Sequence, residues 1–169
     1  MKTTLLYFAY GSNLLTERLV YRIASARFHS VIELPGWRME FAKRGDDGSA
    51  KCTLLEDSEA TTPGVIFEMS MFDLPKLDRI EGKGAGYDRL EVRIPNKDDA
   101  IRAYTYAAQD GWIEPELKPF DWYHALVLAG AREHGLPSEH IARIESELFE
   151  IDQDAERRAH PDQILSTAR

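Results

Sequence analysis

The chain has 169 residues, of which 43% are hydrophobic and 30% charged, and these proportions are typical of a single folded globular domain. Its formal net charge of −8 leaves no basic footprint, which argues against nucleic acid or an anionic membrane surface as a partner. The first apolar run ends at Gly11, too early for a secretory signal, and the lone cysteine, Cys52, is typical of a reducing compartment. We therefore expect a cytoplasmic protein in which Cys52 is a small buried hydrophobe.

The first half of the chain reads mainly as strands. Residues 3–10 are apolar and β-rich, and the turn at 11–13 leads into a helix that Ser12 or Asn13 can cap. Pro35-Gly36 predicts a turn, and residues 45–48 predict a loop. Further strands are expected at residues 26–33, 37–41, 50–55 and 65–71.

The second half mixes helices and strands. Leu74, Leu77 and Ile80 are spaced for a helix over 72–81, which ends at a run of glycines. Alternating side chains predict strands at 87–94 and 101–107. Helices are expected at 120–134 and from Ser138 onward, the latter with Ile141, Ile144 and Leu148 facing inward.

The order of these elements indicates the fold class. Strands come first and in clusters, with helices between and after them, which favours an α+β fold with a mixed or antiparallel sheet, open or closed as a small barrel. Residues 1–150 are expected to form a single domain. Residues 151–169 are polar and are expected to be a loosely held C-terminal tail.

Two segments carry candidate chemistry, each beside an ordinary structural interpretation. Gly11-Ser12-Asn13 is a turn with a helix cap, yet the free backbone N–H groups at such a turn also bind a carboxylate or an oxyanion. Glu81 is by default a surface glutamate. It stands, however, at a helix C-terminus, where the dipole does not favour a carboxylate, and before glycines that let a ligand approach; both features suit a general base.

The remaining polar residues exclude several site types. The five histidines include no pair with the i, i+4 spacing of a helical zinc site, so no metal is expected. The sequence lacks the phosphate-loop, dinucleotide-binding and nucleophile-elbow motifs. Most of the seven tyrosines are expected to be half-buried packing residues, and spacing alone selects none of them.

Three segments together resemble one family. The first is Tyr-Phe-Ala-Tyr-Gly-Ser-Asn-Leu, which begins at Tyr7. The second is Leu-Asp-Arg-Ile-Glu-Gly, which contains Glu81. The third begins at Tyr123 and continues with Gly-Ala-Arg-Glu-His-Gly-Leu-Pro at residues 130–137. In this order and with these residues, the chain resembles the γ-glutamylcyclotransferases.

The resemblance implies a small mixed or antiparallel β-barrel with flanking helices, and a site that needs no metal or organic cofactor. It implies cyclisation of a small-molecule γ-glutamyl amide to 5-oxoproline and a free amine, with Glu81 as the proton-transfer group. It also suggests a homodimer. The residues that it assigns to substrate binding are Tyr7, Phe8, Ala9, Tyr10, Gly11, Ser12, Asn13, Tyr87 and Tyr123.

Other functions on the same scaffold stay open at this point. One is a cyclotransferase that acts on γ-glutamyl-amines, glutathione or an acylated antibiotic intermediate; another is a binding protein without catalysis. The intact Tyr10-Gly11-Ser12-Asn13 motif and Glu81 favour an enzyme. The loop between Glu81 and Tyr87 is about one residue shorter than the corresponding loop of the vertebrate enzymes, which affects the outer pocket and hence the leaving amine.

Overall fold

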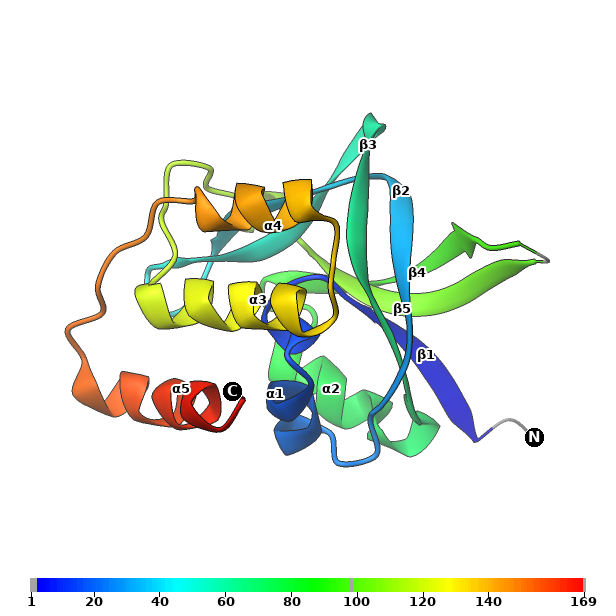
Figure 1. Ribbon diagram of the computed structural model, residues 1–169, viewed down its shortest axis with the longest axis horizontal. Coiled ribbons are helices and arrows are strands. Elements are labelled where there is room, and N and C mark those ends of the chain that lie inside the picture. Colours follow the sequence, from blue (N-terminus) through cyan, green and yellow to red (C-terminus); the bar gives the residue numbers. More distant parts are fainter. Residues whose placement is uncertain (1–2, 98, 169) are drawn as a thin grey trace.

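The computed structural model describes residues 3–97 and 99–168, in which five strands form one sheet flanked by helices (Figure 1). The strands are β1 (Thr4–Ala9), β2 (Arg27–Arg44), β3 (Ala50–Ser70), β4 (Tyr87–Pro95) and β5 (Ala100–Ala108). The helices are α1 (Thr16–Arg22), α2 (Leu74–Glu81), α3 (Asp121–Glu133), α4 (Ser138–Glu145) and α5 (Ala155–Thr167). A short 3₁₀ turn, η1 (Ser12–Leu14), joins β1 to α1.

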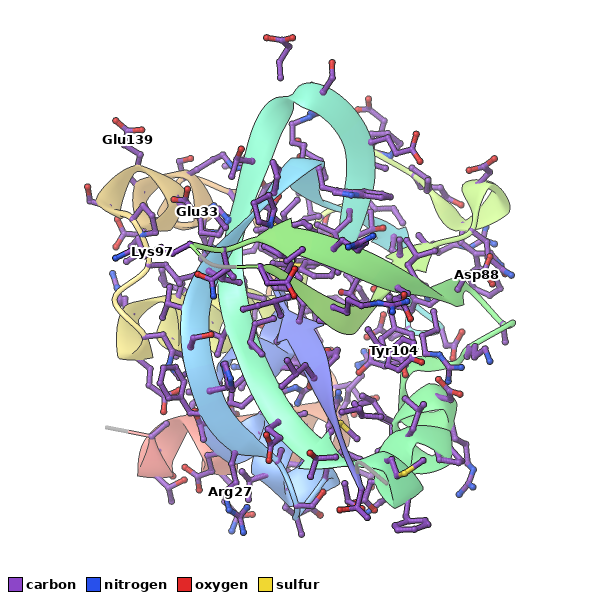
Figure 2. The ribbon with its side chains drawn as sticks, turned by 90° about the vertical axis from the view of Figure 1, so that its right-hand side faces the viewer. Arg27, Glu33, Asp88, Lys97, Tyr104 and Glu139 are labelled. Atoms are coloured by element: carbon purple, nitrogen blue, oxygen red, sulfur yellow. The ribbon has the colours of Figure 1, made fainter. Side chains whose placement is uncertain are left out.

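The sheet is mixed, with the strand order β2-β3-β1-β5-β4. Strand β1 is antiparallel to β3 and parallel to β5, and β4 and β5 form an antiparallel hairpin, which crosses in front of β2 and β3 in Figure 2. The α+β class is confirmed, but the barrel is wrong. In the described residues the edge strands β2 and β4 do not pair with each other, so the sheet stays open. The alternation of side chains shows which face of a strand is buried. Closure of a sheet into a barrel depends on the tilt and stagger of its strands, which alternation does not show.

The largest difference from the expected elements is the length of β2 and β3. Each was expected as two short strands, but the two form one long antiparallel ribbon. Pro35 and Gly36 do not turn the chain: they lie at a shift of register, where Gly36 adopts a φ of +81°. A β-bulge of this kind absorbs residues that break the ladder while the strand continues. The loop at 45–48 is a hairpin turn, as predicted.

Helix α3 brings the distal part of the chain against the β1–η1 connection. Its buried face includes Trp122, Tyr123, Leu126 and Val127. At Gly130 the two backbones nearly touch, because an added Cβ would lie 2.4 Å from the backbone nitrogen of Leu15. Only glycine permits this approach. The contact fixes α3, and the tyrosine it carries, relative to the turn that follows β1.

Much of the C-terminal segment that was expected to be a polar tail is helical. Residues 155–167 form α5, which packs on α3 and lies beside α1 in Figure 1. Ile164 is buried, and the rings of Tyr21 and His160 are 4.3 Å apart. Helix α4 also differs from expectation: it ends at Glu145, which leaves Leu148 69% exposed instead of facing the core.

A buried carboxylate, Asp152, ties this segment to α3. It accepts hydrogen bonds from the indole nitrogen of Trp122 at 2.8 Å and from the guanidinium of Arg157 at 2.6 and 2.7 Å. These bonds, those from Arg157 first, hold the pKa of Asp152 well below its usual range. We expect Asp152→Asn to lower the melting temperature by several degrees at neutral pH, because the amide cannot accept both sets of bonds.

The pH dependence provides a check on this prediction. A carboxylate whose pKa is depressed in the folded state stabilises the protein above the pKa of the unfolded chain, and that stability is lost as pH falls. The difference in melting temperature between wild type and Asp152→Asn should therefore shrink as the pH drops below about 4. A difference that is independent of pH would contradict the role assigned to the charge.

Candidate active site

The turn after β1 presents a polar cluster centred on Asn13. Its amide nitrogen donates to the hydroxyl of Tyr7 at 3.0 Å and to Oε1 of Glu81 at 2.8 Å. Its amide oxygen accepts from Arg22 at 3.0 Å. Neither Asn13 nor Ser12 caps the following helix with its side chain, so the cap predicted from sequence is wrong. The polar side chains of the turn are instead directed into the site.

Glu81 is the last residue of α2, and Gly82 follows it in a left-handed conformation with φ of +72°. The carboxylate side chain is 16% exposed. Oε1 accepts from Asn13 and lies 3.5 Å from the guanidinium of Arg22. Within the described residues no hydrogen bond reaches Oε2. One oxygen is therefore fixed by the protein while the other is available to a ligand.

A narrow inner pocket, about 30 Å³ in volume, lies beside this carboxylate. Seven of the nine residues predicted to bind substrate line it together with Glu81: Tyr7, Tyr10, Gly11, Ser12, Asn13, Tyr87 and Tyr123. Phe8 and Ala9 do not line it. Phe8 is fully buried in the core, and its ring packs against Gly64 of β3. Alternation along β1 places Phe8 on the opposite face of the strand from Tyr7.

The tyrosine hydroxyls of the pocket are mostly occupied by the protein backbone. Tyr10 donates to the carbonyl of Tyr106 at 2.5 Å, and Tyr87 donates to the carbonyl of Cys52 at 2.5 Å. Tyr123 accepts from the backbone N–H of Cys52 at 3.0 Å. Tyr7 accepts from Asn13, and in the described residues its own proton has no acceptor. The same holds for Tyr123 within the described part of the chain, so Tyr7 and Tyr123 are the pocket tyrosines whose O–H is available to a ligand.

Two pocket residues were not predicted as members of the site, Cys52 and Tyr106. Cys52 is a buried hydrophobe, as expected, and burial raises the pKa of its thiol to about 12, so the thiol stays protonated at neutral pH. Tyr106 donates to Asp78 of α2 at 2.7 Å, which connects β5 to the helix that carries Glu81. Nothing in the local sequence of either residue signals a site; only the fold brings them there.

A wider outer chamber, about 270 Å³ in volume, adjoins the inner pocket. Four residues line both spaces: Ser12, Glu81, Tyr87 and Tyr123. Basic side chains surround the chamber, and they were also missed in the sequence because they come from distant elements: Arg18, Arg22, Lys43, Lys51 and Arg79.

In the part of the chain that the structure describes, no group of three or more His, Cys, Asp or Glu side chains is arranged to hold a metal ion. In residues 3–97 and 99–168, no helix combines the length and apolar character needed to cross a bilayer. The cluster of Glu81, Asn13 and Tyr7 is the candidate active site, because it combines a partly free carboxylate with the two adjoining pockets.

Comparison with known proteins defines the class first. The AIG2-like family model matches residues 62–144. A solved structure described as a γ-glutamyl cyclotransferase has a TM-score of 0.82 and 27% identity, and the match covers 95% of this chain and 99% of that one. The fold thus places the chain among the cyclotransferase-like proteins.

Curated relatives are similar over most of their length. The γ-glutamylcyclotransferase of Bos taurus is 33% identical over 150 residues, which cover 83% of this chain and 77% of the relative. The Homo sapiens enzyme is 31% identical with the same coverage. The chain belongs to the γ-glutamylcyclotransferase family, and the resemblance found in its sequence is confirmed.

Proposed function

We propose that the protein converts γ-glutamyl amides to 5-oxoproline and a free amine. The observation that supports this proposal is the Glu81 carboxylate in the narrow inner pocket. Asn13, from the family's Tyr-Gly-Ser-Asn turn, binds one of its oxygens, and the other oxygen is free. Family membership indicates the class of reaction, and the geometry places a proton acceptor, Glu81, in the wall of the inner pocket.

The substrate brings its own nucleophile. The α-nitrogen of a γ-glutamyl amide closes a five-membered ring on the γ-carbonyl carbon, so the enzyme must fold the substrate and move a proton. Glu81 takes a proton from the α-ammonium, and the free amine then attacks the carbonyl carbon. The C–N bond to the leaving group breaks as Glu81 returns the proton to the departing nitrogen. The ring nitrogen then gives up its second proton, by way of Glu81, to the released amine, which departs as an ammonium. No net proton is gained or lost, and no Lewis acid or redox cofactor is needed.

Charge develops on the carbonyl oxygen during ring closure. Gly11 and Ser12 line the inner pocket, and in this proposal their backbone N–H groups either stabilise the oxyanion or bind the anionic end of the glutamyl group. The unassigned O–H of Tyr7 is a second donor for the oxyanion. Tyr10 and Tyr87 act as walls, because each donates its O–H to a backbone carbonyl. Tyr123 only accepts from the N–H of Cys52 and keeps a proton to donate. Phe8 and Ala9 support the turn from the core.

Because the inner pocket is too small for a whole γ-glutamyl group, the substrate has to extend into the outer chamber. The reacting atoms lie near the residues that line both spaces, and the leaving amine lies outside. This arrangement supports a γ-glutamyl amino acid as substrate, since the outer chamber is basic.

The direct test is product formation by purified protein. With γ-glutamyl-alanine, we expect equal molar amounts of 5-oxoproline and alanine, and a rate that a chelator leaves unchanged. Glutathione and a γ-glutamyl-lysine isopeptide, tested in parallel, define the range of acceptors. Absence of 5-oxoproline from every γ-glutamyl compound would favour the binding-protein alternative and reject the enzyme.

We further propose that the enzyme works in the cytoplasm, where γ-glutamyl turnover belongs to glutathione metabolism, and that it forms a homodimer. The buried, unpaired Cys52 supports a reducing compartment. The negative net charge supports a small-molecule substrate over nucleic acid or an anionic membrane.

A further inference from the structure

The outer chamber is basic although the protein is acidic. Five basic side chains and only two acidic ones, Asp46 and Glu81, line it, while the whole chain carries a net charge of −8. Charge of one sign gathered in a concave site attracts ligands of the opposite sign. The chamber is therefore suited to an anion, and a basic side chain without another partner is the one expected to bind it.

Most of these cations already have a role in the protein. Arg18, Arg22 and Lys51 donate to a serine, an asparagine and an aspartate, respectively. Arg22 also lies within 3.5 Å of the catalytic carboxylate. Arg79 is exposed, so water solvates its charge. Only Lys43 combines burial with the lack of a polar partner.

Lys43 lies near the end of β2 and is 7% exposed. In the described residues its ammonium forms no ion pair and no hydrogen bond. It lies 4.8 Å from the ring centroid of Tyr87 and 4.9 Å from that of Trp112. Gly86 leaves room for it, since an added Cβ there would be 3.0 Å from Nζ. The two rings and the glycine hold the ammonium at a fixed position in the chamber wall.

An ammonium placed in this way binds an anion strongly. Lys43 is 7% exposed, so its charge has lost much of its hydration, and this burial lowers the pKa of the side chain. Two aromatic faces compensate for only part of that loss. A carboxylate arriving in the chamber would supply the missing charge-assisted hydrogen bond, at a small cost because Lys43 is already desolvated and positioned.

We propose that Lys43 binds the carboxylate of the leaving amino acid and thereby selects γ-glutamyl amino acids over neutral γ-glutamyl amines. The inference rests on the proposed function. Tyr87 borders both the inner pocket and the outer chamber, so an anion beside Lys43 lies just beyond the reacting amide. In an α-amino acid the carboxylate is only one carbon from the departing nitrogen, which matches this placement.

The test compares two substrates that differ only in charge, γ-glutamyl-alanine and γ-glutamyl-alaninamide. We expect wild type to prefer the carboxylate form in kcat/KM. In Lys43→Met that preference should fall at least roughly tenfold, the factor expected from one charge-assisted hydrogen bond, and mainly through KM. Lys43→Gln repeats the test with a polar side chain, in case the methionine variant folds poorly. Lys76→Met, on the exposed side of α2, should keep the wild-type preference.

The outcomes separate the two proposals. An unchanged preference in both Lys43 variants, or equal loss on both substrates, would overturn the assignment of Lys43 while leaving the cyclotransferase intact. If wild type forms no 5-oxoproline from either substrate, the proposed function fails, and the inference about Lys43 fails with it.

Discussion

Glu81→Gln is expected to reduce the turnover of γ-glutamyl-alanine by roughly 10²–10⁴-fold, the range typical of a lost general acid–base group. The amide keeps the shape of the side chain but takes no proton from the α-ammonium. The turnover of Glu81→Asp should lie between those of wild type and Glu81→Gln, because the shorter side chain withdraws the carboxylate from the substrate and from Asn13. The measurement is the rate of 5-oxoproline formation under saturating substrate.

If Glu81 had only a structural role, Glu81→Gln would lose activity only by losing stability. Measuring the melting temperature of the same sample distinguishes the two roles. Glu81→Gln should remain folded, because the glutamine can still accept the hydrogen bond from Asn13. Glu91→Gln is the matched control, since Glu91 is an exposed strand residue paired with Arg102. It should keep wild-type turnover. Full turnover by a folded Glu81→Gln protein would refute the mechanism.

Gly130→Ala is expected to destabilise the protein by about 1–3 kcal/mol, with the upper end favoured. The added Cβ would lie 2.4 Å from the backbone nitrogen of Leu15 and 2.5 Å from Cβ of Leu14. A backbone atom cannot move aside as a flexible side chain does, so α3 has to shift. The helix propensity of alanine offsets only about 1 kcal/mol of this. The melting temperature should fall by several degrees.

The same change should also reduce activity, because α3 carries Tyr123 and packs on the turn that holds Asn13. Gly111→Ala is the control, as its Cβ would meet no atom within 4 Å and its φ is not positive. We expect that variant to match wild type in stability and rate. A stable, fully active Gly130→Ala protein would show that the contact between α3 and the turn does not position the site.

The sequence was sufficient for elements whose pattern is local. The alternation over residues 87–94 and 101–107 corresponds to β4 and β5, and the helix expected at 72–81 corresponds to α2 and the turn before it. The long ribbon was missed because Pro35 and Gly36 have the composition of a turn, while the pairing of β2 with β3 accommodates them as a bulge. Tertiary pairing overrides local turn preference there.

Helix α5 was missed for a different reason. Its segment is polar and contains Pro161, and only Pro161 and Ile164 are buried, so it lacks the apolar stripe of a packed helix. Its stability comes from ion pairs, as between Arg158 and Asp121 at 2.7 Å, and from the Asp152 cluster. Such pairs join residues far apart in the sequence, and no periodic pattern reports them.

For the site, the sequence could predict the members that belong to a contiguous motif. It could not predict the partners that arrive from other elements, such as Cys52 from β3, Tyr106 from β5 and Lys43 from β2. It also could not show which tyrosine hydroxyls are engaged with backbone groups. That distinction depends on the backbone of Cys52, whose carbonyl accepts from Tyr87 and whose N–H donates to Tyr123.

The separation of a narrow inner pocket from a wide outer chamber also bears on how such an enzyme diversifies. The proton-transfer group and its supports all border the inner pocket, while Lys43 and the loop that carries Asp46 border only the outer chamber. Substitutions in the outer wall can therefore change which amine departs while the ring-closing chemistry is inherited intact. One scaffold can in this way give rise to enzymes that share a product and differ in the partner they release.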